Sequence, residues 1–426
     1  MSDTSDTQKN LGKKVMLPAI LGNLLEWYDF AVYGFLAAII GKNFFPNANE
    51  IVQLLSAFAA FGVGFLVRPL GAVIIGRIGD VKGRKTSLTL TMFLMAAGTV
   101  AIGCLPTFQS IGLLAPILLV LARLVQGFSA GGEWAGATAF IVEWAPEKRR
   151  GFFGSLQQST VAAGLLMGSL VAAFLNSVLT TEQMLDWGWR LPFLLGAILG
   201  PVGLYMRRNL EETPAYREAK KVEQTTVKPS TGAAITMASK VFGFTVLWSI
   251  AFYILLAYMP TFTQKYAGLT AANSLWSNSL GLIVLILVIP LCGHLSDKWG
   301  RKPLLIAGCV CFIVLPYLLF SVMVASPGLQ TVICVQIVFA LMISLLSGPG
   351  PAAVAEIFPT SIRSTWMSTG YALGNAVFGG FAPFIATWLI ANTGSPISPT
   401  YYLSASAVAA VFVVFSFKET AKEKLA

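Results

Sequence analysis

Long apolar segments, interrupted by few charged residues, run through the whole 426-residue chain. Most of them are long enough to cross the ~30 Å hydrocarbon core of a bilayer as a helix. Hydrophobic residues make up 56% of the chain and charged residues 11%, a composition that an ordinary soluble domain does not have. Membrane helices also tolerate the 40 glycines and 21 prolines, because neighbouring helices satisfy the freed backbone groups. The sequence therefore predicts an all-α membrane protein.

The apolar segments fall into two groups of six, with a charged stretch between them. We therefore predict twelve transmembrane helices in two pseudo-symmetric six-helix bundles. The predicted parts are an N-terminal tail (1–14), a first bundle (15–206), a central loop (207–240), a second bundle (241–417) and a C-terminal tail (418–426).

Lysine and arginine residues give the chain a net charge of +10, and they gather in alternate loops. The loops between these carry only Lys42, Arg190 and Lys265. By the positive-inside rule, both termini and the central loop are predicted to be cytoplasmic. The basic residues thus set the topology, and we expect a lipid bilayer rather than nucleic acid as partner. Short outer loops favour a multi-pass protein of the bacterial cytoplasmic (inner) membrane, and we expect a functional monomer.

Two ten-residue segments, 76–85 and 293–302, both read GxxxDxxGRK and follow the second span of each group. A second pair of matches, around Glu143 and Glu356, closes spans four and ten. Because both pairs lie in register, the chain is interpreted as a duplicated six-helix unit. An Asp beside Arg and Lys at a helix end forms a breakable latch, although a basic turn that only fixes topology is the alternative. The predicted gating residues are Asp80, Arg84, Asp297, Arg301, Glu143 and Glu356.

Charged side chains inside the hydrocarbon cost roughly 2.5–3.5 kcal/mol each, so those that remain call for an explanation. Spans one and four each carry three polar residues on one face, which are Asn23, Glu26 and Asp29, and Arg123, Gln126 and Glu133. We predict that these faces meet across a central cavity, with Asn23, Arg123 and Gln126 binding substrate. Arg123 would pair with a carboxylate when substrate is absent, and a permanent structural ion pair is the alternative. Arg68, in span two, is interpreted as a structural residue nearer the cytoplasmic edge.

A transported proton has few possible carriers in this chain. The single histidine, His294, lies at a membrane edge, so a coupled proton needs a carboxylate, and the candidates are Glu26, Asp29 and Glu133. The five cysteines are interpreted as core residues. Neither a metal-ligand spacing, a nucleotide-binding loop nor a nucleophile with its base is present in the sequence. We therefore expect no enzyme, no metal and no cofactor, and an ion gradient as the energy source.

Aromatic residues gather on the same helices as these polar residues. Most aromatic residues of membrane proteins are packing or interfacial residues, but Trp27 and Tyr253 are predicted to line the substrate site. In span ten, Gly348-Pro349-Gly350-Pro351 interrupts the helical hydrogen bonds. Such interruptions in transporters tend to lie beside the substrate path or a gate.

Several motifs resemble those of one transporter family. The paired GxxxDxxGRK segments and residues 123–133 resemble the major facilitator superfamily. Residues 22–30, 68–71, 187–193 and 211–214 resemble its metabolite:proton symporter family, which includes carriers of proline and betaine, α-ketoglutarate, citrate and shikimate. The resemblance implies the major facilitator fold, proton-driven uptake by alternating access, and a cavity formed mainly by spans one, four, seven and ten.

The sequence leaves the substrate class open. We expect a proton-coupled symporter that imports a small carboxylate-bearing metabolite, a di- or tricarboxylate or a related organic acid, because Arg123 suits a carboxylate and the tail after Lys418 lacks a long coiled coil. The alternative is uptake of zwitterionic compatible solutes such as proline or glycine betaine, whose quaternary ammonium suits an aromatic set. A passive channel or sensor on the same fold, and sodium as the coupling ion, also remain open. Span five lacks a Gly-Pro signature typical of drug exporters, so export is disfavoured.

Overall fold

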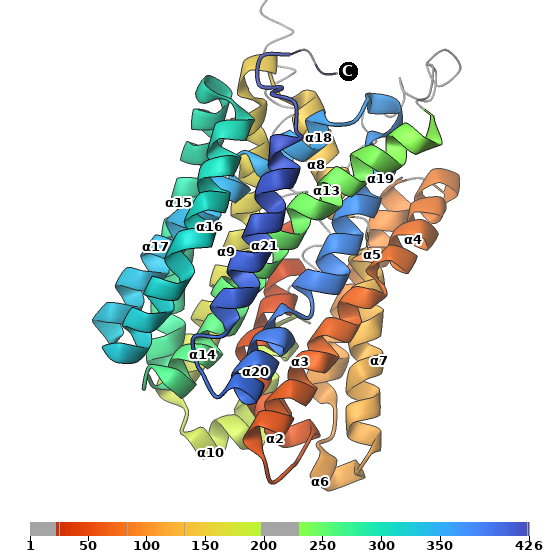
Figure 1. Ribbon diagram of the computed structural model, residues 1–426. Helices are drawn as coiled ribbons and strands as arrows, with labels where there is room; N and C mark the ends of the chain where they lie inside the picture. The colour runs from red at the N-terminus through yellow and green to blue at the C-terminus, as the bar shows by residue number, and fades with distance from the viewer. Residues whose placement is uncertain are drawn as a thin grey trace, which may run out of the picture.

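The computed structural model describes residues 23–24, 26–82, 84–131, 133–196, 230–423 and 425. The side chains of residues 76–77, 79–88, 133, 140, 361 and 364 lie outside the described part. Within it, every regular element is a helix, as Figure 1 shows. Eight helices are long and apolar enough to cross a membrane, and two shorter apolar helices are Thr89–Cys104 and Pro399–Phe415. The all-α membrane fold is thereby confirmed, while the first and sixth expected spans are described only in part.

In the first half, residues 26–35 are helical and lead into α2 (Ala37–Phe44). The next spans are formed by α3 (Glu50–Leu66) with α4 (Arg68–Lys82), α5 (Arg84–Cys104), α7 (Leu114–Ser129) with α8 (Glu133–Trp144), and α9 (Arg150–Val178). Short turns connect them, namely α6 (Phe108–Ile111), η1 (Glu147–Arg149), α10 (Thr181–Gln183) and η2 (Met184–Gly188).

The second half repeats this arrangement. Its spans are α13 (Thr231–Phe252) with η3 (Tyr253–Tyr258) and α14 (Met259–Tyr266), α15 (Ala271–Trp299), α16 (Arg301–Ala325), α17 (Leu329–Ser347) with α18 (Gly350–Glu356), α19 (Thr360–Gly374) with η4 (Asn375–Gly379) and α20 (Ala382–Thr393), and α21 (Pro399–Phe415). Helix α13 begins at Thr231, before the expected residue 241, because the Ser230 side chain caps it by accepting the Ala233 amide at 3.3 Å.

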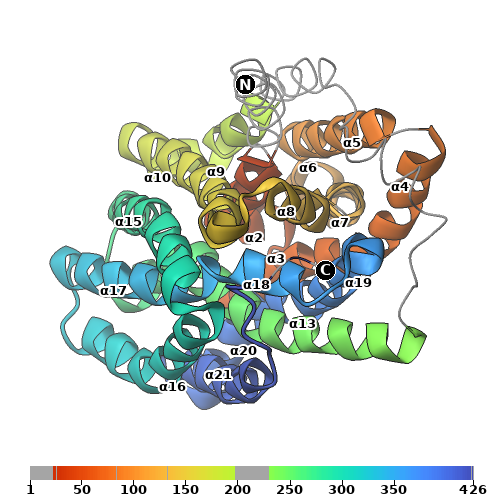
Figure 2. The ribbon, with the colours of Figure 1, turned by 90° about the horizontal axis from the view of Figure 1, so that it is seen from above.

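The two halves lie side by side, and the view along the helices in Figure 2 shows the first half on one side and the second half on the other. Helix α9 of the first half packs along α15 of the second, and α3 packs on α20. The basic end of the molecule is the end where α15 finishes and α9 begins. The halves therefore meet along their whole length, and what lies between them depends on the side chains of these interface helices.

Glycines let the helices of the first half touch through their backbones. A Cβ atom at Gly127 of α7 would collide with the carbonyl oxygen of Gly64 in α3, and a Cβ at Gly71 of α4 would collide with the carbonyl of Phe128. In lipid the hydrophobic effect does not drive helices together, so close packing through small residues stabilises such crossings instead. Spans two and four are therefore held at backbone contact distance, which fixes Arg68 and Arg123 relative to each other.

This crossing predicts a strong effect of one methyl group. Gly127→Ala places a Cβ against the Gly64 backbone, and we expect a loss of about 1–3 kcal/mol of stability or more, because neither backbone can move freely. Gly136→Ala in α8 is the matched control, since nothing lies within 4 Å of its Cβ position. Melting temperatures of the purified protein in detergent measure both. Equal melting temperatures for the two variants would contradict the close crossing.

Candidate functional site

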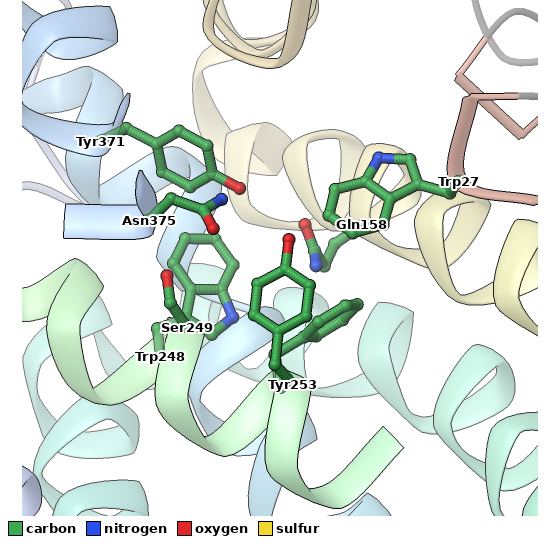
Figure 3. A pocket seen from close by; sticks show the side chains of 8 residues that line it. Trp27, Gln158, Trp248, Ser249, Tyr253, Tyr371 and Asn375 are labelled. Carbon is green, nitrogen blue, oxygen red and sulfur yellow. The ribbon is translucent and has the colours of Figure 1, made fainter. Parts of the chain in front are cut away.

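A cavity lies between the two halves of the molecule. Eight residues line it, and they are Trp27, Gln158, Trp248, Ser249, Phe252, Tyr253, Tyr371 and Asn375. Figure 3 shows Trp27 and Gln158 on one side, Tyr371 and Asn375 on the other, and Tyr253 between them. Seven of the eight wall residues are buried, and Tyr371 is half-buried.

Two π-helical turns carry two of the polar residues of the wall, Tyr253 and Asn375. Tyr253 is the first residue of the π-helical segment η3, and Asn375 is the first residue of η4. Such π segments are often found at functional sites. The wider helical turn gives a side chain a direction that a regular α-helix would not. Gly379 permits the two segments to approach, since a Cβ there would lie 2.6 Å from the Asn375 side-chain oxygen and 2.9 Å from the Tyr253 ring. Spans seven and eleven thus present their polar groups at one place.

The aromatic rings of the wall support one another. Trp27 stacks near Tyr253, with ring centroids 6.2 Å apart and planes 27° apart. Across the cavity, Trp248 meets Tyr371 edge-on at 6.3 Å, and Trp134 of α8 stacks behind Tyr371 at 3.8 Å. The indole nitrogen of Trp248 donates to the Ser347 hydroxyl at 2.8 Å. These contacts fix the ring faces, so the cavity is a preformed aromatic site.

None of the eight described wall residues is charged. The hydroxyl of Tyr253 and the side-chain oxygen of Asn375 are buried, and neither makes a hydrogen bond of regular geometry within the described part of the chain, although the Asn375 side chain lies close to the Tyr253 hydroxyl. A buried polar atom without a partner costs about 1–3 kcal/mol, which a bound ligand can recover. The cavity is therefore suited to a small molecule without net charge that offers an apolar or cationic part to the rings and a polar part to these groups.

Two of the predicted substrate residues lie in the wall, and three do not. Trp27 and Tyr253 line the cavity. Asn23 instead donates to the Thr160 hydroxyl at 2.8 Å and thereby ties span one to α9. Arg123 and Gln126 lie inside the first half and outside the wall.

The polar faces of spans one and four do meet, but within the first half rather than across the cavity. Arg123 is fully buried and donates to the Gln126 side-chain oxygen at 2.8 Å, while its guanidinium lies 4.4 Å from the centre of the Tyr33 ring. Gln126 in turn donates to the Thr99 hydroxyl at 2.7 Å. Asp29 lies beside Thr99 and interacts electrostatically with Arg123. Arg123 is thus engaged by the Gln126 side chain inside the first half.

The candidate proton carriers have different surroundings. Glu26 is 8% exposed and acts electrostatically on Tyr253 and Tyr371, the two tyrosines of the cavity. Asp29 is held by Thr99 and Arg123, away from the wall. The side chain of Glu133 lies outside the described part. Among the described carboxylates of span one, Glu26 is thus the one that acts on the cavity.

Sequence reasoning missed the contributions of spans five and eleven. The wall comes from spans one, five, seven and eleven, whereas the family resemblance implied spans one, four, seven and ten. Spans four and ten lie behind the wall through Trp134 and Ser347, and the break at Gly350 lies against Trp248. The glycines Gly370, Gly374 and Gly379 of span eleven were the available signal, because they mark a helix that approaches its neighbours closely.

At the basic end, charged residues close the interface between the halves. Both carboxylate oxygens of Asp297, at the end of α15, accept backbone amides at the start of α9, Gly151 at 2.8 Å and Phe152 at 2.9 Å. The N-terminus of a helix favours such an anion. Arg301 pairs with Asp297 at 2.7 Å, as the second latch motif predicts. The equivalent side chains Asp80 and Arg84 lie outside the described part.

Glu356 is the second anchor of this closure. Its side chain is 1% exposed and contacts Arg301 of its own half at 3.2 Å and Arg150 of the other half at 3.3 Å. The Thr420 hydroxyl of the C-terminal segment also donates to it. In the reciprocal contact, Arg363 of the second half pairs with Glu143 of the first at 2.6 Å. Each half therefore contributes both an arginine and a glutamate to ion pairs with the other half. We call the cluster the ionic gate, after the role predicted from the sequence, and its residues are Glu143, Arg150, Asp297, Arg301, Glu356 and Arg363.

The ionic gate follows the internal repeat. Arg150 follows Glu143 by seven residues, and Arg363 follows Glu356 by the same interval. Arg150 is buried and makes the contact with Glu356, whereas the neighbouring Arg149 is exposed. The opposite end closes differently, through the Phe58 and Tyr258 rings at 5.6 Å and a Trp276 to Ser177 hydrogen bond at 3.2 Å. The described contacts thus join the two halves at both ends of the cavity.

A duplicated helical bundle with a cavity between its halves is the architecture of an alternating-access membrane transporter. A family model described as "Sugar (and other) transporter" matches residues 15–229, and one described as "Major Facilitator Superfamily" matches residues 276–426. The D-xylose-proton symporter has the same fold, with a TM-score of 0.77 at 19% identity over 96% of this chain and 98% of that one. A partially occluded inward-open structure of the xylose transporter XylE from E. coli gives 0.80 at 18% identity over 97% and 99%.

Curated relatives cover almost the whole chain. The glycine betaine/proline/ectoine/pipecolic acid transporter OusA of Dickeya dadantii is 35% identical over 97% of this chain and 84% of the relative. The proline/betaine transporter of Escherichia coli is 34% identical over 97% and 85%, and a putative proline/betaine transporter of Staphylococcus aureus is 37% identical over 94% and 87%. The chain therefore belongs to the major facilitator superfamily, and its resemblance to the metabolite:proton symporter family is confirmed. It is a multi-pass inner-membrane protein and a secondary active transporter, not an enzyme.

The expected di- or tricarboxylate substrate is wrong. The relatives that match nearly the whole chain are proline/betaine transporters. The physical reason is visible in the wall, which offers rings and neutral groups, while Arg123, on which the expectation rested, is engaged inside the first half. A carboxylate-binding arginine also cannot separate an organic acid from a zwitterion, because both carry that group.

The ionic gate predicts which charge holds the basic end closed. Glu356→Gln leaves two buried arginines without their shared carboxylate, a change that costs about 3–5 kcal/mol for a buried pair. We expect faster hydrogen exchange at the start of α9, measured by mass spectrometry of the purified protein. Glu50→Gln is the control, because Glu50 pairs with Lys42 at the exposed opposite end, where such a pair contributes about 1 kcal/mol or less. Unchanged exchange in α9 of Glu356→Gln would show that the gate does not depend on this carboxylate.

Proposed function

We propose that this transporter imports a zwitterionic compatible solute of the proline or glycine betaine class, in symport with protons, by alternating access. The observation that carries the proposal is the cavity between the halves, whose described wall is rich in aromatic residues and uncharged. The relatives support the same substrate class through the names that they bear. A zwitterion has no net charge, so it enters such a wall at a lower desolvation cost than a dicarboxylate.

The faces of the aromatic rings in the wall bind the cationic end of the solute. A quaternary or secondary ammonium gains about 0.5–2 kcal/mol from each aromatic face that it meets at close range. Trp27 and Tyr253 stack on one side and Trp248 stands on the other, so a small cation has rings on more than one side.

The contacts at the two ends of the cavity suggest how transport would proceed. The charge pattern assigns the basic end to the cytoplasm, so release into the cell requires that Glu356, Asp297 and their partners separate. The opposite end is held by rings and a hydrogen bond, and its opening admits substrate from outside. The two ends open alternately as the halves rock about the cavity.

Uptake by proteoliposomes tests the proposal. Radiolabelled glycine betaine and proline, with citrate and succinate as comparison compounds, are offered with and without an inward proton gradient, and with a sodium gradient in its place. We expect gradient-stimulated accumulation of betaine or proline with protons alone. Accumulation of citrate or succinate instead, or a requirement for sodium, would overturn the substrate or the coupling ion respectively.

Glu26 is proposed as the carboxylate that carries the proton, because it acts on both cavity tyrosines. Glu26→Gln mimics the protonated state permanently. We expect it to abolish accumulation driven by a proton gradient and to retain exchange of labelled for unlabelled substrate, which needs no net proton movement. Asp29→Asn is the comparison, and Asp29 becomes the carrier if that variant alone shows this separation of accumulation from exchange.

A further inference from the structure

Arg68 is a buried cation whose hydrogen-bonding capacity is only partly used. It is the first residue of α4, directly after the break at Val67 that separates α3 from α4. The residue is 5% exposed, and its guanidinium lies 4.0 Å from the centre of the Phe65 ring and 4.4 Å from that of Phe30. Its Nε and Nη2 atoms have no hydrogen-bond partner among the described residues. The rings hold the side chain in place without satisfying these donors.

The contacts of Arg68 lead directly to the cavity. The Phe65 ring, on which the guanidinium rests, packs edge-on against the Tyr253 ring at 5.2 Å. The charge of Arg68 acts electrostatically on the hydroxyls of Tyr253 and Tyr371, and both of these residues line the wall. Tyr253 also has an unused hydroxyl. Arg68, with two unused donors, is not itself a wall residue, but it lies one aromatic ring away from Tyr253 of the wall.

The other buried arginine of this half is less suited to a ligand. Arg123 also has unpartnered Nε and Nη2 atoms, but its Nη1 is bonded to Gln126 and Asp29 lies near enough to compensate its charge. The rings of Tyr33, Phe30 and Phe61 surround it at 4.4, 5.0 and 5.1 Å. Its electrostatic effect on Tyr253 is smaller than that of Arg68.

The proposed substrate needs what Arg68 offers. The described wall holds the ammonium end of a zwitterion with rings, but none of its residues compensates a carboxylate. A carboxylate that loses its water shell needs charge-assisted donors, and arginine provides two parallel N–H groups that match its two oxygens.

We propose that Arg68, together with the Tyr253 hydroxyl, binds the carboxylate of the zwitterionic substrate, while the ammonium end packs among Trp27, Trp248 and the Tyr253 ring. Arg68 is then a specificity-determining residue, which replaces the structural role expected from its position in span two. This assignment rests on the proposed function, since it concerns the same cavity. In this assignment Arg123 of the first half has a structural role, and Arg68 of the same half binds the substrate.

Direct binding to two ligands that differ only at the carboxylate end tests this assignment. Glycine betaine and choline share a trimethylammonium group, but choline carries a hydroxyl in place of the carboxylate. Both are titrated calorimetrically into the purified full-length chain. We expect Arg68→Gln to weaken betaine binding by about tenfold or more and to change choline binding by less than about threefold, since only betaine loses a charge-assisted contact. Arg123→Gln is the matched control and is expected to leave the ratio of the two affinities unchanged.

The outcomes separate the two proposals. If the original chain binds neither betaine nor proline, the proposed function fails and the Arg68 assignment fails with it. If the original chain binds betaine but Arg68→Gln keeps its preference over choline, or Arg123→Gln loses that preference, only the assignment is overturned. Should Arg68→Gln not fold, Arg68→Lys and Tyr253→Phe provide the same test, because each removes part of the carboxylate contact and leaves the rings in place.

Discussion

Glu356 lies buried between the two halves, and its carboxylate is shared by Arg301 of one half and Arg150 of the other. Charges are expensive to remove from water, so this cluster persists because each member is neutralised by partners from both halves. Asp297 adds a second link, from the end of α15 to the backbone amides that start α9. The contacts that close the basic end therefore form and break together, as one cluster. A carrier needs that property at a gate, because the gate must be either closed or open.

The gate and the cavity are connected through the same interface helices. Helix α9 begins at the ionic gate and carries Gln158 into the wall, while α13, η3 and η4 bring the rings and the polar groups from the opposite side. A substrate that occupies the cavity therefore contacts both halves at once. Its binding energy can be used to hold the halves together while one gate opens, which is the physical requirement of alternating access. The aromatic wall makes this possible for a neutral zwitterion without placing further net charge in the membrane.

Much of the fold could be predicted from the sequence, because apolar length, charge distribution and the repeated GxxxDxxGRK motif act locally along the chain. The site was predicted only in part. Trp27 and Tyr253 were found because they lie on helices marked by polar residues, whereas Asn375 begins the π-helical turn η4 and Tyr371 lies four residues before it in α19, at positions that no motif of the sequence marks. Arg123 was overvalued because its partners Gln126 and Asp29 are spatial neighbours whose engagement only the packing reveals.

Current across a supported membrane of proteoliposomes tests the central claim most directly. Glycine betaine carries no net charge near neutral pH, so its symport with a proton must move positive charge into the liposome. With equal pH on both sides and no sodium, a jump in betaine concentration is predicted to give an inward positive current that falls as the proton concentration is lowered. Labelled betaine that enters without any current, or a current that appears only with sodium, would contradict proton-coupled uptake of a zwitterion.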